Sequence, residues 1–183
     1  MNNLTRFEMI LRSWCEINTG SRNHDGQTQI QALLAKEFGQ LPATSNVLDL
    51  PTHPALHIKK NRPKDAPKLS ILFVGHTDTV FSQTHSFQSV TQLEGDKLSG
   101  PGILDMKAGI LILLESLKTM ESQPWAKDIN WEVLLTSDEE IGSPDSKDWL
   151  VTESNRFDIG LVFEPCLENG NFISDRKGST NIK

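Results

Sequence analysis

The chain has 183 residues, of which 37% are hydrophobic and 23% are charged, as in ordinary globular proteins. A formal net charge of −6 and the absence of a basic block argue against a nucleic-acid partner. Two cysteines are too few for a disulfide scaffold, and the sequence has neither a membrane-spanning apolar run nor a signal-peptide core, so we expect a cytoplasmic protein that does not bind membranes.

The first part of the sequence predicts two helices followed by two short strands. Apolar residues recur at helical spacing over 4–17 and 25–38. Gly39 is typical of the residue that ends a helix. The segments 47–50 and 55–59 flank a stretch with two prolines and are expected to be strands.

The middle of the sequence predicts a buried strand and a long helix. Residues 69–74 are almost all apolar, as expected for a strand that is covered on both faces. Residues 81–99 are polar and irregular and are expected to hold one weak hairpin. The helix is predicted over 106–120, after the tight loop Gly100–Gly102.

The last part predicts two further buried strands, over 129–135 and 159–163, with a short helix over 144–151 between them. One more strand is expected over 171–176. Alternating strands and helices imply right-handed crossovers between parallel strands. The sequence therefore predicts an α/β fold, a three-layer sandwich with a mainly parallel (mixed) central sheet.

Acidic and imidazole side chains gather just past the ends of the three buried strands. Ligand sites in open parallel sheets lie outside the carboxyl ends of the strands. Such a group of side chains suits a divalent metal ion far better than it suits a core. The residues concerned are His76 and Asp78, then Glu139 and Glu140, then Glu164, with Asp105 at the start of the long helix.

Each of these residues also has a structural interpretation. His76 and Asp78 point to the same side of extended chain, where the carboxylate can fix the tautomer of the ring, but a capping Asp beside a structural His gives the same pattern. Asp105 taken alone favours a helix N-cap. Glu139 and Glu140 point in different directions, so that one can bind a metal while the other handles protons; a solvated acidic turn is the alternative.

Glu164 is a further candidate for the site, whereas the other four histidines are not. Glu164 ends a very apolar strand and therefore needs a partner. The other four histidines lie in polar or turn-like segments without a matching acidic pattern, so we expect them at the surface. They are His24, His53, His57 and His85.

Three strings carry a family resemblance: 74–80 (VGHTDTV), 100–109 (GPGILDMKAG) and 136–142 (TSDEEIG). In order and spacing they resemble the two-zinc exopeptidase and deacylase family. That family includes acetylornithine deacetylase, succinyl-diaminopimelate desuccinylase, aminoacylase and glutamate carboxypeptidase. The resemblance extends from the N-terminal helices to about residue 178.

The resemblance implies a role for each residue of the group. His76 and Glu164 would bind one zinc, Asp105 would bridge two, and Glu140 would bind the second. Asp78 would orient His76, and Glu139 would be the general base that takes a proton from water and passes it to the leaving nitrogen. Cobalt or manganese are alternatives to zinc. The substrates would be amides next to a carboxylate, in N-acyl amino acids or small peptides.

The resemblance also implies a cis peptide after Asp105 and a division of the chain. Residues 1–178 would be the N-terminal portion of the catalytic domain, and 179–183 the start of a truncated connection to a lid domain. The lid carries the oligomerisation surface of the family, and later segments supply further histidines. Two hypotheses therefore remain: a zinc-dependent metallohydrolase, or a catalytically inactive folded fragment that acts only as a metal- or partner-binding module.

Overall fold

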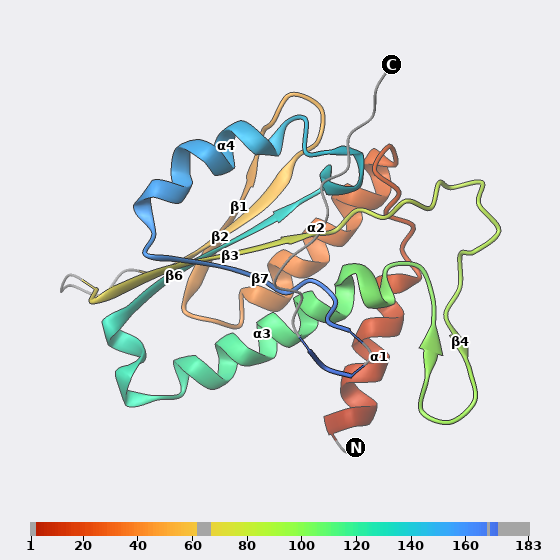
Figure 1. Ribbon diagram of the computed structural model, residues 1–183, viewed down its shortest axis with the longest axis horizontal. Coiled ribbons are helices and arrows are strands. Elements are labelled where there is room, and N and C mark those ends of the chain that lie inside the picture. The colour runs from red at the N-terminus through yellow and green to blue at the C-terminus, as the bar shows by residue number, and fades with distance from the viewer. Residues whose placement is uncertain (1–2, 62–66, 168, 172–183) are drawn as a thin grey trace.

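Five strands form one mixed sheet in the order β1-β2-β6-β3-β7. The computed structural model describes residues 3–61, 67–167 and 169–171. The strand β3 pairs in parallel with β6 and β7, whereas β2 pairs antiparallel with β1 and β6, so within this sheet only β2 is reversed (Figure 1). The strands are β1 (Ala43–Leu48), β2 (Ala55–Lys60), β3 (Leu69–His76), β6 (Ile129–Thr136) and β7 (Ile159–Val162).

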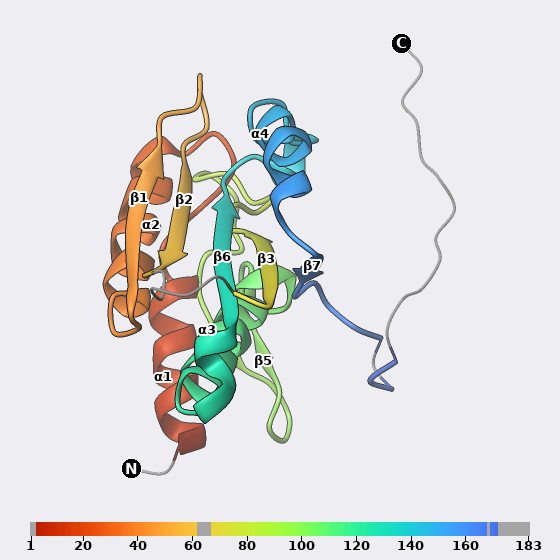
Figure 2. The same cartoon turned by 90° about the vertical axis from the view of Figure 1, so that its left-hand side faces the viewer.

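Helices cover both faces of the sheet, which confirms the predicted three-layer α/β arrangement (Figure 2). The main core lies between the sheet and the first three helices, and a smaller cluster lies between the sheet and the last helix. In the described residues no helix is both long and apolar enough to cross a membrane. The helices are α1 (Asn3–Cys15), α2 (His24–Phe38), α3 (Ala108–Glu121) and α4 (Ser146–Glu153).

The alternation of side chains along β3 explains why its sequence is almost wholly apolar. Ile71 and Phe73 point into the main core, and Leu72 and Val74 point into the cluster under α4. Successive residues of a strand face opposite sides of a sheet, so a strand covered on both faces needs apolar residues at every position. The strand is thereby fixed in the middle layer, and its last residue, His76, lies at the carboxyl edge.

Most predicted elements are present, with some shifted bounds. The strand predicted over 47–50 is β1 at Ala43–Leu48; it is an edge strand whose polar residues are partly exposed, so its sequence lacks the apolar signature of a buried strand. The weak hairpin is confirmed as β4 (Thr91–Gln92) and β5 (Leu98–Ser99). The strand predicted over 171–176 lies outside the described residues except for Asn171.

The long helix α3 begins at Ala108, two residues later than predicted, because a tight turn precedes it. Ile103–Lys107 form a π-type turn in which Asp105 has φ −118° and ψ 99°, which is extended rather than helical backbone. The Asp105–Met106 peptide is cis, as the family resemblance implied. Short 3-10 turns lie at Pro124–Asp128, Glu139–Ile141 and Ser154–Arg156.

Candidate metal centre

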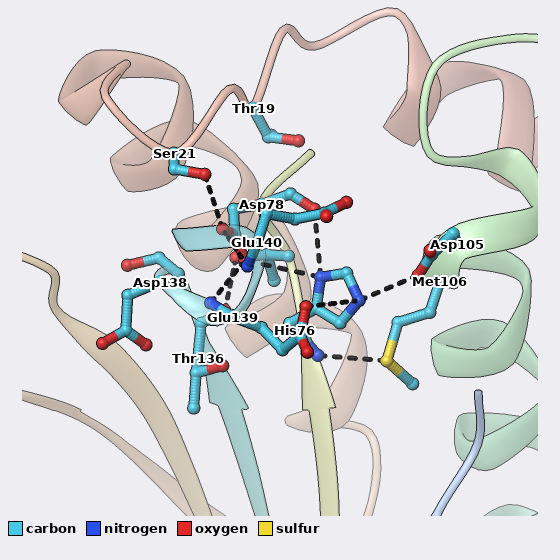
Figure 3. Close-up of polar contacts among 12 residues, drawn as sticks. Thr19, Ser21, His76, Asp78, Asp105, Met106, Thr136, Asp138, Glu139 and Glu140 are labelled. Atoms are coloured by element: carbon cyan, nitrogen blue, oxygen red, sulfur yellow. Dashed lines mark hydrogen bonds and ion pairs between the residues drawn. The ribbon is translucent and has the colours of Figure 1, made fainter. Parts of the chain in front are cut away.

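The side chains predicted to form the site converge at the carboxyl edge of the sheet. His76 is the last residue of β3 and is aligned with Thr136, the last residue of β6. Glu139 follows in a 3-10 turn just after β6, and Glu164 lies two residues beyond β7. Asp105 reaches the same point from the turn before α3 (Figure 3). The parallel arrangement of β3, β6 and β7 therefore gathers residues from three segments, and the turn before α3 adds the fourth.

The His76 ring, which is 1% exposed, lies at the centre of this group. Its Nε2 atom lies 2.9 Å from Oδ1 of Asp105, 3.5 Å from Oε1 of Glu164 and 4.0 Å from Oε2 of Glu139. One ligand atom each from His76, Asp105 and Glu164 lie within 4.8 Å of one another. One imidazole and two carboxylates at this spacing form a donor set that suits zinc.

Electrostatics in the group reflect an excess of negative charge. Burial disfavours the charged form of His76, but the hydrogen bond with Asp78 and the charges of Asp78, Glu164 and Asp105 outweigh it and raise the pKa of His76 to about 9. Burial, together with the charges of Asp105 and Glu139, raises the pKa of Glu164. Burial and Asp105 likewise raise the pKa of Glu140. The group therefore has too little positive charge to balance its carboxylates, and a bound cation would supply it.

Asp78 organises the opposite side of the ring, and its carboxylate is fully buried. The Nδ1 atom of His76 lies 3.0 Å from the backbone oxygen of Asp78 and 3.4 Å from its Oδ1 atom. The same carboxylate accepts hydrogen bonds from the backbone N–H groups of Glu139, at 3.2 Å, and Glu140, at 3.1 Å. Ser21 donates its hydroxyl to Oδ2 at 2.7 Å. Asp78 thus fixes both the ring and the acidic turn (Figure 3).

Asp105 is not a helix N-cap, contrary to the structural interpretation of its sequence position. The cap of α3 is Lys107, and the carboxylate of Asp105 is 54% exposed and faces His76. The turn that carries Asp105 is attached to the end of α1. The buried Nζ of Lys107 donates to the backbone oxygens of Trp14 (3.1 Å) and Ile17 (3.2 Å). On the other side, the backbone N–H of His76 donates to the sulfur of Met106 at 3.1 Å.

A close approach between α3 and the end of β7 brings Glu164 into the group. A Cβ atom added to Gly109 would lie 2.0 Å from the backbone oxygen of Phe163, the residue before Glu164. Only glycine leaves room for the two backbones at this distance. Gly109 therefore allows the carboxylate of Glu164 to reach His76.

A second group of possible ligand atoms, His53, Asp138 and Asp145, is occupied by internal hydrogen bonds. Asp138 accepts from the N–H groups of Asp145 and Ser146 and from the hydroxyl of Ser146. Asp145 accepts from the N–H groups of Thr52 and His53 and lies 2.9 Å from Nδ1 of His53. These bonds attach the start of α4 to the turn before β2, which is a structural role.

The prediction that all four other histidines lie at the surface is wrong for two of them. His24 and His85 are exposed, but His53 is 8% exposed and His57 only 2%. The Nε2 atom of His57 lies 2.7 Å from Oε2 of Glu132, and Arg156 donates to the other oxygen at 2.7 Å. The partner of His57 lies 75 residues away in the sequence, so the residues around His57 do not predict this pair.

Comparison with known proteins places these residues in a family context. A family model described as peptidase family M20/M25/M40 matches residues 72–178. Carboxypeptidase G2 from Pseudomonas sp. (strain RS-16) is 35% identical over 96 residues, which are 52% of this chain and 23% of that protein. Succinyl-diaminopimelate desuccinylase from Gluconobacter oxydans (strain 621H) is 31% identical over 147 residues, 73% of this chain and 36% of that protein. The chain thus spans about a quarter to a third of these relatives.

Solved structures agree on the fold. An M20 family metallo-carboxypeptidase, Sso-CP2 from Sulfolobus solfataricus, superposes with a TM-score of 0.72 at 20% identity, covering 93% of this chain and 39% of that one. Human carnosine dipeptidase 1 superposes with a TM-score of 0.70 at 20% identity, covering 86% of this chain and 38% of that one. The α/β sheet and the helices on its two faces are therefore shared with these enzymes.

Proposed function

The chain belongs to peptidase family M20/M25/M40, and on this basis we propose that it is the zinc-binding part of a metallohydrolase that cleaves an amide next to a carboxylate. The substrates would be N-acyl amino acids or small peptides. The observation that carries the proposal is the convergence of His76, Asp105 and Glu164 within 4.8 Å at the sheet edge. Residues 1–178 would form part of the catalytic domain.

The residues present fit a zinc ion. His76 supplies an imidazole nitrogen, and Asp105 and Glu164 supply carboxylate oxygens, the three kinds of protein atom that catalytic zinc sites combine. Asp105 and Glu164 are both exposed on one side, which leaves the position open to a substrate. The raised pKa values of Glu164 and Glu140 also indicate that the cluster favours an added positive charge. Cobalt or manganese would suit the same donors.

Zinc would supply Lewis acidity, polarising the amide carbonyl and making water a better nucleophile. The chain supplies the proton transfers and the geometry. Glu139 is the proposed general base: its carboxylate is half exposed and lies 4.0 Å from His76, so it can take a proton from water and pass it to the leaving nitrogen. Asp78 holds the backbone of Glu139 in place and orients the His76 ring, which keeps Nε2 directed at the open side.

Glu140 and Asp105 are the proposed ligands for a second metal ion. Both are carboxylates, and in the described residues the only imidazole in the cluster is that of His76. Two carboxylates rarely hold zinc tightly. This observation favours a second candidate function for the chain by itself, a metal- or partner-binding module without catalysis. We therefore expect one tight zinc ion per chain, and very slow hydrolysis.

Calorimetric titration of the metal-free 183-residue chain with zinc tests the proposed site. We expect one tight equivalent in the wild-type chain. His76→Ala and Glu164→Gln should each reduce the affinity by at least about tenfold, because each removes one of three protein ligands. His53→Gln is the matched control, since its group is already satisfied by internal hydrogen bonds.

The two candidate functions separate in a parallel hydrolysis assay on N-acyl amino acids and dipeptides with zinc present. Turnover at ordinary enzyme rates, about 1–10³ per second, would exclude the non-catalytic module. Unchanged zinc binding in His76→Ala would exclude the proposed site.

A further inference from the structure

An open pocket of about 490 Å³ lies beside the acidic turn that holds Glu140. Its walls come from the segment before α2, from the residues that follow Asp78, and from Glu140 and Ile141. Ser21 belongs to this pocket and also donates to Asp78. Figure 3 shows Ser21 bonded to Asp78, whose carboxylate also accepts from the backbone N–H of Glu140. The pocket and the candidate metal centre therefore share a wall.

A network of side-chain amides fixes the pocket walls relative to one another. Asn23 donates to the backbone oxygen of Asn18 at 2.8 Å, and Gln83 donates to Oδ1 of Asn23 at 3.0 Å. Asn18 in turn donates to the backbone oxygen of Phe81 at 3.1 Å and to Gln88 at 2.8 Å. The segment before α2 and the segment after Asp78 are thus joined by several bonds, so the pocket is formed in advance of any ligand.

The pocket lining combines hydroxyls and amides with apolar surface, and it has one positive and one negative side chain. Arg22 and Glu140 are its only charged lining residues, and among the described residues the exposed guanidinium of Arg22 forms no ion pair. Most other walls are hydroxyls and amides; the aliphatic Val80 and Ile141 are 66% and 44% exposed. Thr79, which is 2% exposed, has a hydroxyl without a hydrogen-bond partner within the described part of the chain.

We propose that this pocket binds a carboxylate-bearing arm of the substrate, with Arg22 as the residue that selects it, so that acidic N-acyl amino acids bind better than apolar ones. This rests on the proposed function, because the arm must belong to the molecule whose amide lies at the metal centre. An arginine guanidinium matches a carboxylate with two parallel hydrogen bonds. The volume is ample for an amino-acid side chain, and the guanidinium of Arg22 is the group in the lining that distinguishes a carboxylate from a neutral side chain.

Amide chemical-shift titration of the 183-residue chain tests the proposal, in zinc-free buffer and again with zinc. The probes are N-acetyl-L-glutamate, its neutral analogue N-acetyl-L-glutamine, and N-acetyl-L-leucine. We expect N-acetyl-L-glutamate to shift the amide signals of Gly20, Ser82 and Thr84 and to bind more tightly than the other two. Arg22→Gln should weaken its binding by about fivefold, the loss expected for one exposed ion pair. Arg22→Lys should recover part of the loss.

Lys36→Gln is the matched control, because it removes one positive charge from the exposed last turn of α2, away from the pocket. Equal binding of the three probes, equal binding in wild-type and Arg22→Gln chains, or shifts confined to residues outside the pocket would each overturn the proposal. Zinc binding at His76 with no pocket response would leave the proposed function intact and reject only the subsite. A pocket response without zinc binding would reject the proposed function and leave only carboxylate binding in the pocket.

Discussion

The Nδ1 atom of His76 faces Asp78 twice, lying 3.0 Å from its backbone oxygen and 3.4 Å from its carboxylate. Both contacts require a proton on Nδ1, so Nε2 is the nitrogen left to bind a metal ion. Because the same carboxylate accepts from the backbone of Glu139 and Glu140, the orientation of the ring and the position of the acidic turn depend on one side chain.

Asp78→Asn is expected to weaken zinc binding by about 10–100-fold, the range found when a partner that orients a metal ligand is lost. An amide can accept one of the hydrogen bonds, but its NH₂ group would face donors. Competition with a coloured chelator measures the affinity. Asp96→Asn in the exposed hairpin is the control. An affinity for zinc that is equal in Asp78→Asn and wild type would show that Asp78 has only a structural role.

The stability of the metal-free chain is expected to fall between pH 6.5 and pH 9. The pKa of His76 is raised to about 9 in the folded state from an ordinary 6.5, so its contribution is fully present below pH 6.5 and is lost as the pH rises through 9. The raised pKa values of Glu140 and Glu164 act in the same direction at lower pH. Lys107, with its pKa lowered to about 8, acts oppositely above that pH.

Urea denaturation at pH 6 and pH 7 isolates the His76 contribution from that of Lys107, because both values lie below the lowered pKa of Lys107. We expect a lower midpoint at pH 7 than at pH 6 in the wild type and a smaller difference in His76→Gln. The same pH dependence in both chains would mean that other groups carry it.

Glu132→Ala is expected to lower the free energy of unfolding by about 3–5 kcal/mol, because it leaves buried His57 without its partner and removes one of the two carboxylates that Arg156 contacts. The carboxylate is 3% exposed, and although burial opposes its charged form, the hydrogen bond from His57 and the charge of Arg156 lower its pKa. Glu115→Ala is the control: its pair with Lys118 is more exposed and should contribute less than about 1 kcal/mol. Similar losses in both variants would contradict the assignment.

Gly109→Ala is expected to destabilise the chain by about 1–3 kcal/mol and to weaken zinc binding. In a helix without this contact, alanine would gain up to about 1 kcal/mol over glycine. Here its Cβ would meet the backbone of Phe163, and Glu164 would move with it. Gly160→Ala in β7 is the control, since nothing lies within 4 Å of an added Cβ. Urea denaturation and zinc titration of both variants measure the two effects. A Gly109→Ala chain that is more stable than the wild type would contradict the prediction.

The position of the candidate site was readable from the sequence because it follows from strand direction. Once 69–74, 129–135 and 159–163 are recognised as buried parallel strands, the residues just after them must meet at one edge. His76, Glu139 and Glu164 are brought together in this way. The extended backbone at Asp105 was not readable from composition or periodicity, since an aspartate before a helix resembles a cap.

Contacts between distant segments account for what the sequence did not reveal. Ser21 reaches Asp78 across 57 residues, and His57 reaches Glu132 across 75. Each of these side chains has an ordinary local context, and its role depends on which strands become neighbours. The early part of β1 was missed for another reason: an edge strand keeps polar residues, so hydrophobic periodicity fades there.

The outermost strand β7 has consequences for handling the chain. Its neighbour in the described sheet is β3 alone, and Ile159, Leu161 and Val162 are 40%, 41% and 57% exposed. An apolar margin with open backbone N–H and C=O groups is a template for another strand, which makes it a point of self-association. Since Glu164 follows two residues later, strands that pair there would also disturb the proposed zinc site. Metal affinity should therefore be measured at low protein concentration, where such pairing is least.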